Sequence, residues 1–497
     1  MSSNKILVDD ASVVAYLTKL MNNEESKLTP EMLKIVANAN TNDEEKENIV
    51  ETKEDDEYSE KDSEYLESEG IDIDITFTSK EEFNQQMKEG LKQLREVGYR
   101  VYFGIKLEKE VNLDPKAVTD KDLDKVYDFK CASNLNNSVS NLKMHNIMKK
   151  DISRCRIFPK YKSGSLDNPG SFRYLTESPN TLKILDRLWC LEVVKMCDAN
   201  KNLPNPDIFK TNLVRAFSNS CLLTAIENTL SIDNVALLDI QRAYDSFDWD
   251  ITEELLLANL TRKVNKEFAS KAVAEYMVIL RNRKLYYNNI HVPVSKGIPT
   301  GLPSSQLVIT LALDEIIYRF LQDNKNRYEL LVDFKLLVYV DDFYLKIMKN
   351  SRVKGLIIVN DLIAYLAKYK LYISMKKSRI SKELVESSNN EFTILTNNDL
   401  YLGIPFTRDI KLYGQIILKE FNKKHNNVLT WNDIHNILIN KTELYSRVLG
   451  YMNYKLKPFI NDETDNTMIE FINKHYLIKP SVFSTIFNWC SGLFSFK

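Results

Sequence analysis

The feature that most constrains this sequence is a pair of adjacent acids with apolar residues on both sides, in LLVYVDDFYLKI (336–347). Both flanks are rich in β-branched and aromatic residues, so the segment predicts a β-hairpin with Asp341 and Asp342 at its tip. Two neighbouring carboxylates repel each other, and an apolar sheet beside them drives them towards protonation. A divalent cation removes that conflict, and Mg²⁺ is usually held by one or two carboxylates with water and phosphate oxygens. The hairpin therefore predicts metal-dependent phosphoryl transfer.

A third acid ends a second apolar run, VALLD (235–239). A short, unbroken apolar run is typical of a buried central strand. At the ends of adjacent strands, Asp239 and Asp341 could share two metal ions, which clamp the attacking and leaving oxygens of an in-line displacement. Tyr244 follows five residues later and could stack beneath a bound sugar, leaving little room for a 2′-hydroxyl. The alternatives are that Asp239 caps a helix over 242–247 and that Tyr244 is a core residue.

In this order the residues resemble the palm of a reverse transcriptase. That family has an Asp on one strand with an aromatic residue five positions later, and a Tyr-x-Asp-Asp hairpin on the next strand. Here these are Asp239 with Tyr244, and YVDD (339–342). The resemblance implies a site for two Mg²⁺ ions, which Mn²⁺ could replace, at Asp239, Ile240 through its backbone, Asp341 and Asp342.

Between the two acidic motifs, GIPTGLPSS (297–305) is similar to the family's glycine-rich segment, which packs against the template and the incoming nucleotide. The helical apolar period of the next segment (307–321) suits that position. Many family members have Gln where this chain has Thr300. The resemblance implies contacts to substrate from Gly297, Pro299, Thr300 and Gly301.

Upstream, residues 158–175 read as a hairpin with a Gly, Ser and Pro turn. In the family, a Lys and an Arg of such a fingers hairpin hold the triphosphate, and fixed cations offset the charge that develops on pyrophosphate. Arg173 matches the Arg, and either Lys160 or Lys162 matches the Lys. The helix after this hairpin is matched by ILDRLW (184–189).

Downstream, LYISMKKSRI (371–380) resembles the segment whose Lys could protonate pyrophosphate. Lys377 is the best match, and a solvated surface charge is the alternative. YLGIPF (401–406) resembles the primer-grip hairpin through Leu402 and Gly403. Residues 446–454 resemble a thumb helix.

The charge distribution agrees with a nucleic-acid partner once the chain is divided. Residues 1–75 hold 21 acids and 7 bases, a net charge of −14, whereas the remaining residues hold 48 acids and 60 bases, a net of +12. Such a basic excess suits a groove that follows phosphates. The acidic excess lies mainly in 41–74, whose few apolar residues predict disorder.

The expected fold is α+β, a right-hand polymerase of fingers, palm and thumb with an antiparallel palm sheet plus helices. Ser79 and Glu82 form a capping box for a helix that reaches about Val97, and 98–105 read as a strand. The expected organisation is a short helical N-terminal segment (1–40), an acidic disordered linker (41–75), an N-terminal extension of the fingers (76–150), a fingers and palm core (151–410), a helical thumb (411–480) and an amphipathic C-terminal tail (481–497).

The remaining signals concern localisation. The six Cys show no paired metal spacing and there are only five His, so the Cys are expected to be reduced and a structural zinc site is not expected. We find neither a signal peptide nor a transmembrane segment. An intracellular, soluble protein is expected, and its oligomeric state is left open.

The sequence thus predicts an RNA-directed DNA polymerase that extends a primer on an RNA or DNA template with dNTPs. An RNA-dependent RNA polymerase and a template-independent nucleotide polymerase are alternatives that Tyr244 argues against. A catalytically silent nucleic-acid-binding scaffold is a further alternative, disfavoured because three unneutralised acids would destabilise it. A cellular, viral or antiviral defence role would each fit.

Overall fold

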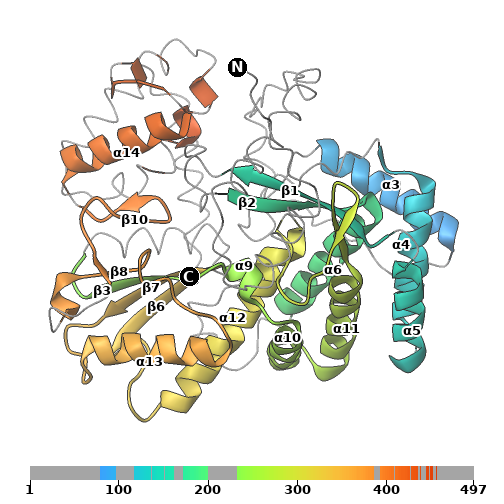
Figure 1. The fold of residues 1–497 in the computed structure, drawn as a ribbon, viewed down its shortest axis with the longest axis horizontal. Coiled ribbons are helices and arrows are strands. Elements are labelled where there is room, and N and C mark those ends of the chain that lie inside the picture. Colours follow the sequence, from blue (N-terminus) through green and yellow to red (C-terminus); the bar gives the residue numbers. More distant parts are fainter. Residues whose placement is uncertain are drawn as a thin grey trace, which may run out of the picture. The chain divides into compact units, whose positions relative to one another are not determined.

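The structure is a computed structural model, which contains the elements α3 to α14 (Figure 1). Contacts divide the chain into two compact units, which are described separately. The first includes Glu64–Asn219 and Ala236–Ser378, and the second includes Ser220–Val235 and Arg379–Lys497. The structure describes residues 79–96, 117–135, 137–149, 152–161, 172–199, 232–300, 302–385, 392–407, 409–425, 427–431, 433–434, 437, 444–446, 448–451 and 455.

A four-stranded sheet in the first unit has the order β2-β1-β4-β5. β1 is antiparallel to β2 and parallel to β4, and β4 is antiparallel to β5. The predicted hairpin over 158–175 is confirmed by β1 and β2, although its turn lies outside the described residues. The strands are β1 (Arg154–Tyr161), β2 (Phe172–Glu177), β4 (Lys284–Tyr287) and β5 (Ile290–Val292).

Five helices share a buried apolar core with one face of this sheet. Cys155 and Ile157 of β1 and Leu285 of β4 point into that core, so the alternate residues of these strands lie on the other face. The predicted helix at Ser79 is confirmed, since the Glu82 N–H donates to Ser79 Oγ at 3.1 Å. The helices are α3 (Lys80–Glu96), α4 (Asp120–Ser133), α5 (Asn137–Met148), α6 (Asn180–Ala199) and α11 (Lys266–Asn282).

Three neighbouring strands of a second sheet have the order β6-β7-β3. They are β6 (Phe334–Tyr339), β7 (Asp342–Ile347) and β3 (Val235–Asp239). β6 and β7 are antiparallel neighbours, which confirms the hairpin predicted over 336–347. Two helices lie along one side of the sheet, α12 (Pro303–Asn324) and α13 (Gly355–Lys368) (Figure 1).

The helix α12 starts four residues before the predicted one. Pro303 occupies its first turn, where a missing N–H costs nothing, and Leu302 before it supplies no side-chain cap. The carboxylate of Asp186, from α6, replaces the cap: the Ser304 N–H donates to Asp186 Oδ2 at 2.8 Å. Asp186 and Ser304 are completely buried, so this contact fixes where α12 begins.

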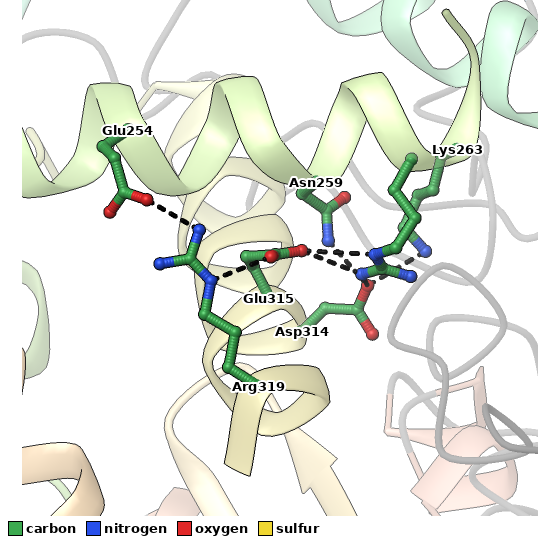
Figure 2. Close-up of polar contacts among 7 residues, drawn as sticks. Glu254, Asn259, Lys263, Asp314, Glu315 and Arg319 are labelled. Atoms are coloured by element: carbon green, nitrogen blue, oxygen red, sulfur yellow. Dashed lines mark hydrogen bonds and ion pairs between the residues drawn. The ribbon is translucent and has the colours of Figure 1, made fainter. Parts of the chain in front are cut away.

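Charged side chains join α12 to α10 (Trp249–Lys263), as Figure 2 shows. Asp314 is almost fully buried, accepts a hydrogen bond from Asn259 at 2.8 Å and lies 3.0 Å from Lys263. Glu315, also buried, lies 3.0 Å from Arg262. Buried carboxylates are stable only when paired in this way, so the network locks the two helices together. Its members are Glu254, Asn259, Arg262, Lys263, Asp314, Glu315 and Arg319.

The second unit has its own small core. Apolar residues of α14 (Ile410–His425), among them Tyr413 and Phe421, pack with Ile434 and Val448. Val235 exchanges two hydrogen bonds with Ser381, at 2.9 and 2.8 Å. The other elements are β8 (Arg379–Ile380), the 3₁₀ turn Lys382–Leu384, β9 (Thr393–Ile394), β10 (Leu400–Tyr401) and β11 (Ile404–Pro405).

The structure therefore combines helices and sheets, which agrees with the predicted α+β class. The arrangement into fingers, palm and thumb stays a prediction. The predictions for residues 1–75, for a strand over 98–105 and for the tail 481–497 concern residues that the structure does not describe. Only part of the predicted thumb helix is described, with 445, 446, 448–451 and 455 helical. Among the helices that the structure describes, none has the length and apolar character needed to span a bilayer.

Candidate active site

The two adjacent acids occupy the tip of the β6–β7 hairpin. Tyr339 pairs with Asp342, so Val340 and Asp341 form a two-residue turn. Val340 has φ 55°, a conformation that a β-branched residue rarely adopts and that costs on the order of 1–3 kcal/mol. Asp341 is half-buried and Asp342 is exposed. The strain at Val340 is thus what lets a tight turn present a carboxylate beside the sheet.

Asp239 is the last residue of β3, the strand next to β7. Its backbone is held on both sides: the Asp239 N–H donates to Ser378 Oγ at 3.1 Å, and the Ser374 N–H donates to Asp239 O at 2.8 Å. The helix that follows, α9 (Ala243–Ser246), has no side-chain cap, so the alternative in which Asp239 caps it is wrong. Asp239 therefore stands at the end of a strand adjacent to the acidic hairpin, as predicted.

Lys377 lies against Asp239, a contact that the sequence did not predict. Lys377 Nζ is 3.2 Å from Asp239 Oδ1. The lysine side chain is 60% exposed and that of the aspartate 30%, so water screens the pair and its contribution to stability is about 0–1 kcal/mol. The lysine proposed as a proton donor is thus also the counter-ion of a proposed metal ligand.

A metal site at these acids stays a prediction. Within the described ranges, there is no group of three or more His, Cys, Asp or Glu side chains that could hold a metal ion. The donor chemistry nevertheless fits, because Asp239, Asp341 and Asp342 offer the oxygen ligands that Mg²⁺ prefers and lie on neighbouring strands. The Ile240 backbone, the fourth predicted ligand, pairs with Ile373.

Tyr244 and the glycine-rich segment are in direct contact. The Ile298 N–H donates to Tyr244 O at 2.7 Å, and Trp249 Nε1 donates to Gly297 O at 2.8 Å. Gly297 has φ 87°, and a Cβ there would lie 3.3 Å from Tyr244 O and from Asp245 Cα. Only glycine therefore allows the segment to approach the Tyr244 turn this closely.

The rest of that segment is tied to its surroundings through its backbone. Pro299 O accepts a hydrogen bond from the Ser305 hydroxyl, and Thr300 O accepts one from the Thr176 N–H at 3.3 Å. Thr176 belongs to β2, so Thr300 is linked to the strand that carries Arg173. Gly301 lies outside the described residues.

On the β1–β2 hairpin, Lys160 and Arg173 are directly opposite each other in register. Cβ atoms of such pairs are about 4.5–5.5 Å apart. Lys162 lies outside the described residues. Of the two lysines considered, Lys160 is thus the one whose backbone position pairs with the arginine.

In the second unit, Leu402 and Gly403 form a tight turn between β10 and β11. Both have positive φ, 50° and 75°, as in a type I′ hairpin turn. Lys455 Nζ donates to Gly403 O, and the Tyr413 hydroxyl donates to Lys455 O. Burial lowers the pKa of Lys455 to about 8, and nearby Lys424 contributes. Sequence reasoning missed this lysine because it lies 52 positions from its partner.

Comparison with known proteins agrees with the motifs. A family model described as reverse transcriptase (RNA-dependent DNA polymerase) matches residues 158–406, half of the chain. A search of curated proteins finds no match. The matched span contains β3, the acidic hairpin and the Tyr244–Gly297 contact. The chain belongs to the reverse transcriptase family.

Proposed function

We propose that this protein is an RNA-directed DNA polymerase, which extends a primer 3′-end with dNTPs on an RNA or DNA template. The observation that carries the proposal is the position of Asp239 at the end of β3, beside the strand that begins at Asp342. The family match supports the same reaction type.

Each residue has a role in this proposal. Asp239, Asp341, Asp342 and the Ile240 carbonyl would hold two Mg²⁺ or Mn²⁺ ions, which would activate the primer hydroxyl and neutralise charge on the leaving group. Tyr244 excludes the ribose 2′-hydroxyl. The nucleotide and the templating base are contacted by Gly297, Pro299, Thr300 and Gly301. The triphosphate is held by Arg173 and Lys160 (or Lys162). The primer end is positioned by Leu402 and Gly403, and Lys377 gives a proton to pyrophosphate.

One observation favours the non-enzymatic alternative. A scaffold with three unneutralised acids would be unstable, but Lys377 already neutralises Asp239 without a metal. Retention of that acid is therefore weaker evidence for catalysis than the sequence implied.

The test is primer extension by the wild type, Asp239→Asn and Asp341→Asn, on RNA and DNA templates. The proposal predicts template-length products from dNTPs with the wild type and none with either variant, while both variants keep the wild-type unfolding temperature. Primer extension by either variant would show that the wrong acids were chosen. Primer elongation without a template would indicate a nucleotide-adding enzyme, and the absence of any product with the wild type would support the scaffold.

A further inference from the structure

The outer face of the four-stranded sheet carries a cluster of basic and aromatic side chains. Because Cys155 and Leu285 point into the core, Arg154 and Arg156 of β1 and Lys284 of β4 lie on the opposite face, and all three are exposed. Within the described residues of β1 and β2, Glu177 is the carboxylate paired in register with Arg156. The face therefore has a positive charge, the sign that a phosphate backbone requires.

Within this face, Arg154 is held by two neighbours. Its guanidinium carbon lies 4.6 Å from the centroid of the Tyr286 ring, and its Nη2 donates to Asn289 Oδ1 at 3.0 Å. Tyr286 in turn contacts the ring of His291, with centroids 5.5 Å apart. Arg154, Tyr286 and His291 are called the Arg154 platform below.

The position of Asn289, which accepts the hydrogen bond from Arg154, follows from a tight turn. Asn288 and Asn289 connect β4 to β5 as a two-residue turn in which both have positive φ, 44° and 67°. Such turns favour asparagine because its side chain tolerates this backbone conformation. The turn thus fixes the backbone position from which the Asn289 side chain accepts the hydrogen bond of Arg154.

We propose that the Arg154 platform stacks on bases of an unpaired nucleic-acid strand. Guanidinium planes and aromatic rings are the surfaces on which proteins stack bases, and base stacking accepts any sequence. Duplex has no exposed base faces except at its ends, so this occupant is single-stranded. The inference rests on the proposed function in one respect: the unpaired strand would be the template ahead of the primer end.

The backbone register gives the platform a place on the path of the substrate. Every second position of β1 belongs to the same face, so the positions of Arg154 and Arg156 are followed along the strand by that of Lys160. Lys160 is paired in register with Arg173. Those two residues are the proposed triphosphate grip. A strand that lies on the platform would therefore run along β1 towards the proposed polymerisation site.

The test is equilibrium binding without dNTPs or divalent cations, so that polymerisation plays no part. The probes are a fluorescent primer–template with an unpaired template end of ten nucleotides, and the same duplex with blunt ends. The variants are Arg154→Lys, which keeps the charge and removes the planar group, Arg154→Gln, which removes both, and Tyr286→Leu, which keeps an apolar support. The matched control is Lys368→Gln, since Lys368 Nζ lies 4.4 Å from the ring of Tyr365, and both residues belong to α13, away from the four-stranded sheet.

The proposal predicts that Arg154→Lys and Tyr286→Leu each weaken binding of the unpaired end by about tenfold. Arg154→Gln should in addition lower the slope of log K against log salt by about one. Binding of the blunt duplex should change less than twofold in every variant, and Lys368→Gln should bind like the wild type. Unchanged binding of the unpaired end by Arg154→Lys and by Tyr286→Leu, with unfolding temperatures intact, overturns the platform.

The outcome also separates this inference from the proposed function. If the wild type extends primers and the platform variants bind normally, the platform is wrong and the polymerase stands. If the wild type extends nothing but loses binding in the platform variants, the platform stands without the polymerase.

Discussion

Lys377 Nζ lies 3.2 Å from Asp239 Oδ1, so a lysine neutralises the carboxylate that the family motif assigns to metal binding. Both groups are partly exposed, and an exposed ion pair is worth about 0–1 kcal/mol. A divalent cation bound at Asp239, as proposed above, would therefore displace the lysine at little cost. The released ammonium would then be available to a leaving pyrophosphate.

This exchange predicts that Lys377→Met raises the affinity for Mn²⁺. Removal of a competing cation worth up to about 1 kcal/mol should tighten Mn²⁺ binding by about fivefold. Calorimetric titration of the protein without nucleotide measures it.

A closely matched ion pair provides the control. Lys370 Nζ lies 2.7 Å from Asp248 Oδ2, with exposures of 59% and 28%, against 60% and 30% for the Lys377 pair. Lys370→Met should leave Mn²⁺ affinity unchanged. Equal effects of the two substitutions would mean that the Mn²⁺ does not compete with Lys377 at Asp239.

Tyr244 is expected to set the preference for dNTPs over NTPs. Its carbonyl accepts the Ile298 N–H, which holds the Tyr244 backbone against the glycine-rich segment. Tyr244→Ala should raise incorporation of NTPs relative to dNTPs by about tenfold or more, whereas Tyr244→Phe, which keeps the ring, should discriminate like the wild type. The ratio of kcat/KM for the two nucleotides is the measurement, and an unchanged ratio in the alanine variant would remove Tyr244 from this role.

The network between α10 and α12 is expected to stabilise the first unit. Asp314→Asn leaves Lys263 and Arg262 with an incomplete set of buried partners and should cost about 3–5 kcal/mol in the free energy of unfolding. Glu254→Gln removes an exposed partner of Arg319 and should cost less than about 1 kcal/mol. Urea denaturation measures the free energy of unfolding of both variants. A similar loss of stability in both would contradict the stabilising role of the buried network.

Lys455 predicts an unusual dependence of stability on pH. Its folded pKa is about 8, below the value of about 10.4 for an unfolded lysine, so the unfolded chain binds more protons between these values. Stability should therefore rise as pH increases from about 8 to 10, by an amount on the order of 3 kcal/mol. Lys455→Met has no charge to bury, and its free energy of unfolding should lack this rise relative to the wild type. Parallel pH profiles for the two proteins would show that the lysine is not buried in solution.

Much of the fold follows from patterns local in sequence. The apolar flanks of the acids predicted β6 and β7, and the unbroken run before Asp239 predicted β3. The helix predicted over 307–321 is confirmed as α12, whose earlier start depends on Asp186, a residue distant in sequence. A Thr119–Asp122 capping box marks the start of α4 and was a usable signal that the sequence reasoning passed over.

Contacts between distant residues were beyond prediction because no local pattern specifies them. The Lys377–Asp239 pair spans 138 positions and the Arg154–Asn289 bond spans 135. The choice between Lys160 and Lys162 was likewise open in the sequence, since strand register depends on the turn between the strands.

The proposed RNA-directed DNA polymerase activity is tested most directly by primer extension on an RNA template with dNTPs and Mg²⁺, comparing the wild type with Asp341→Asn. Template-length DNA is expected from the wild type, and no product from Asp341→Asn at equal folded concentration. Equal extension by the two proteins, or none by the wild type with either Mg²⁺ or Mn²⁺, would contradict it.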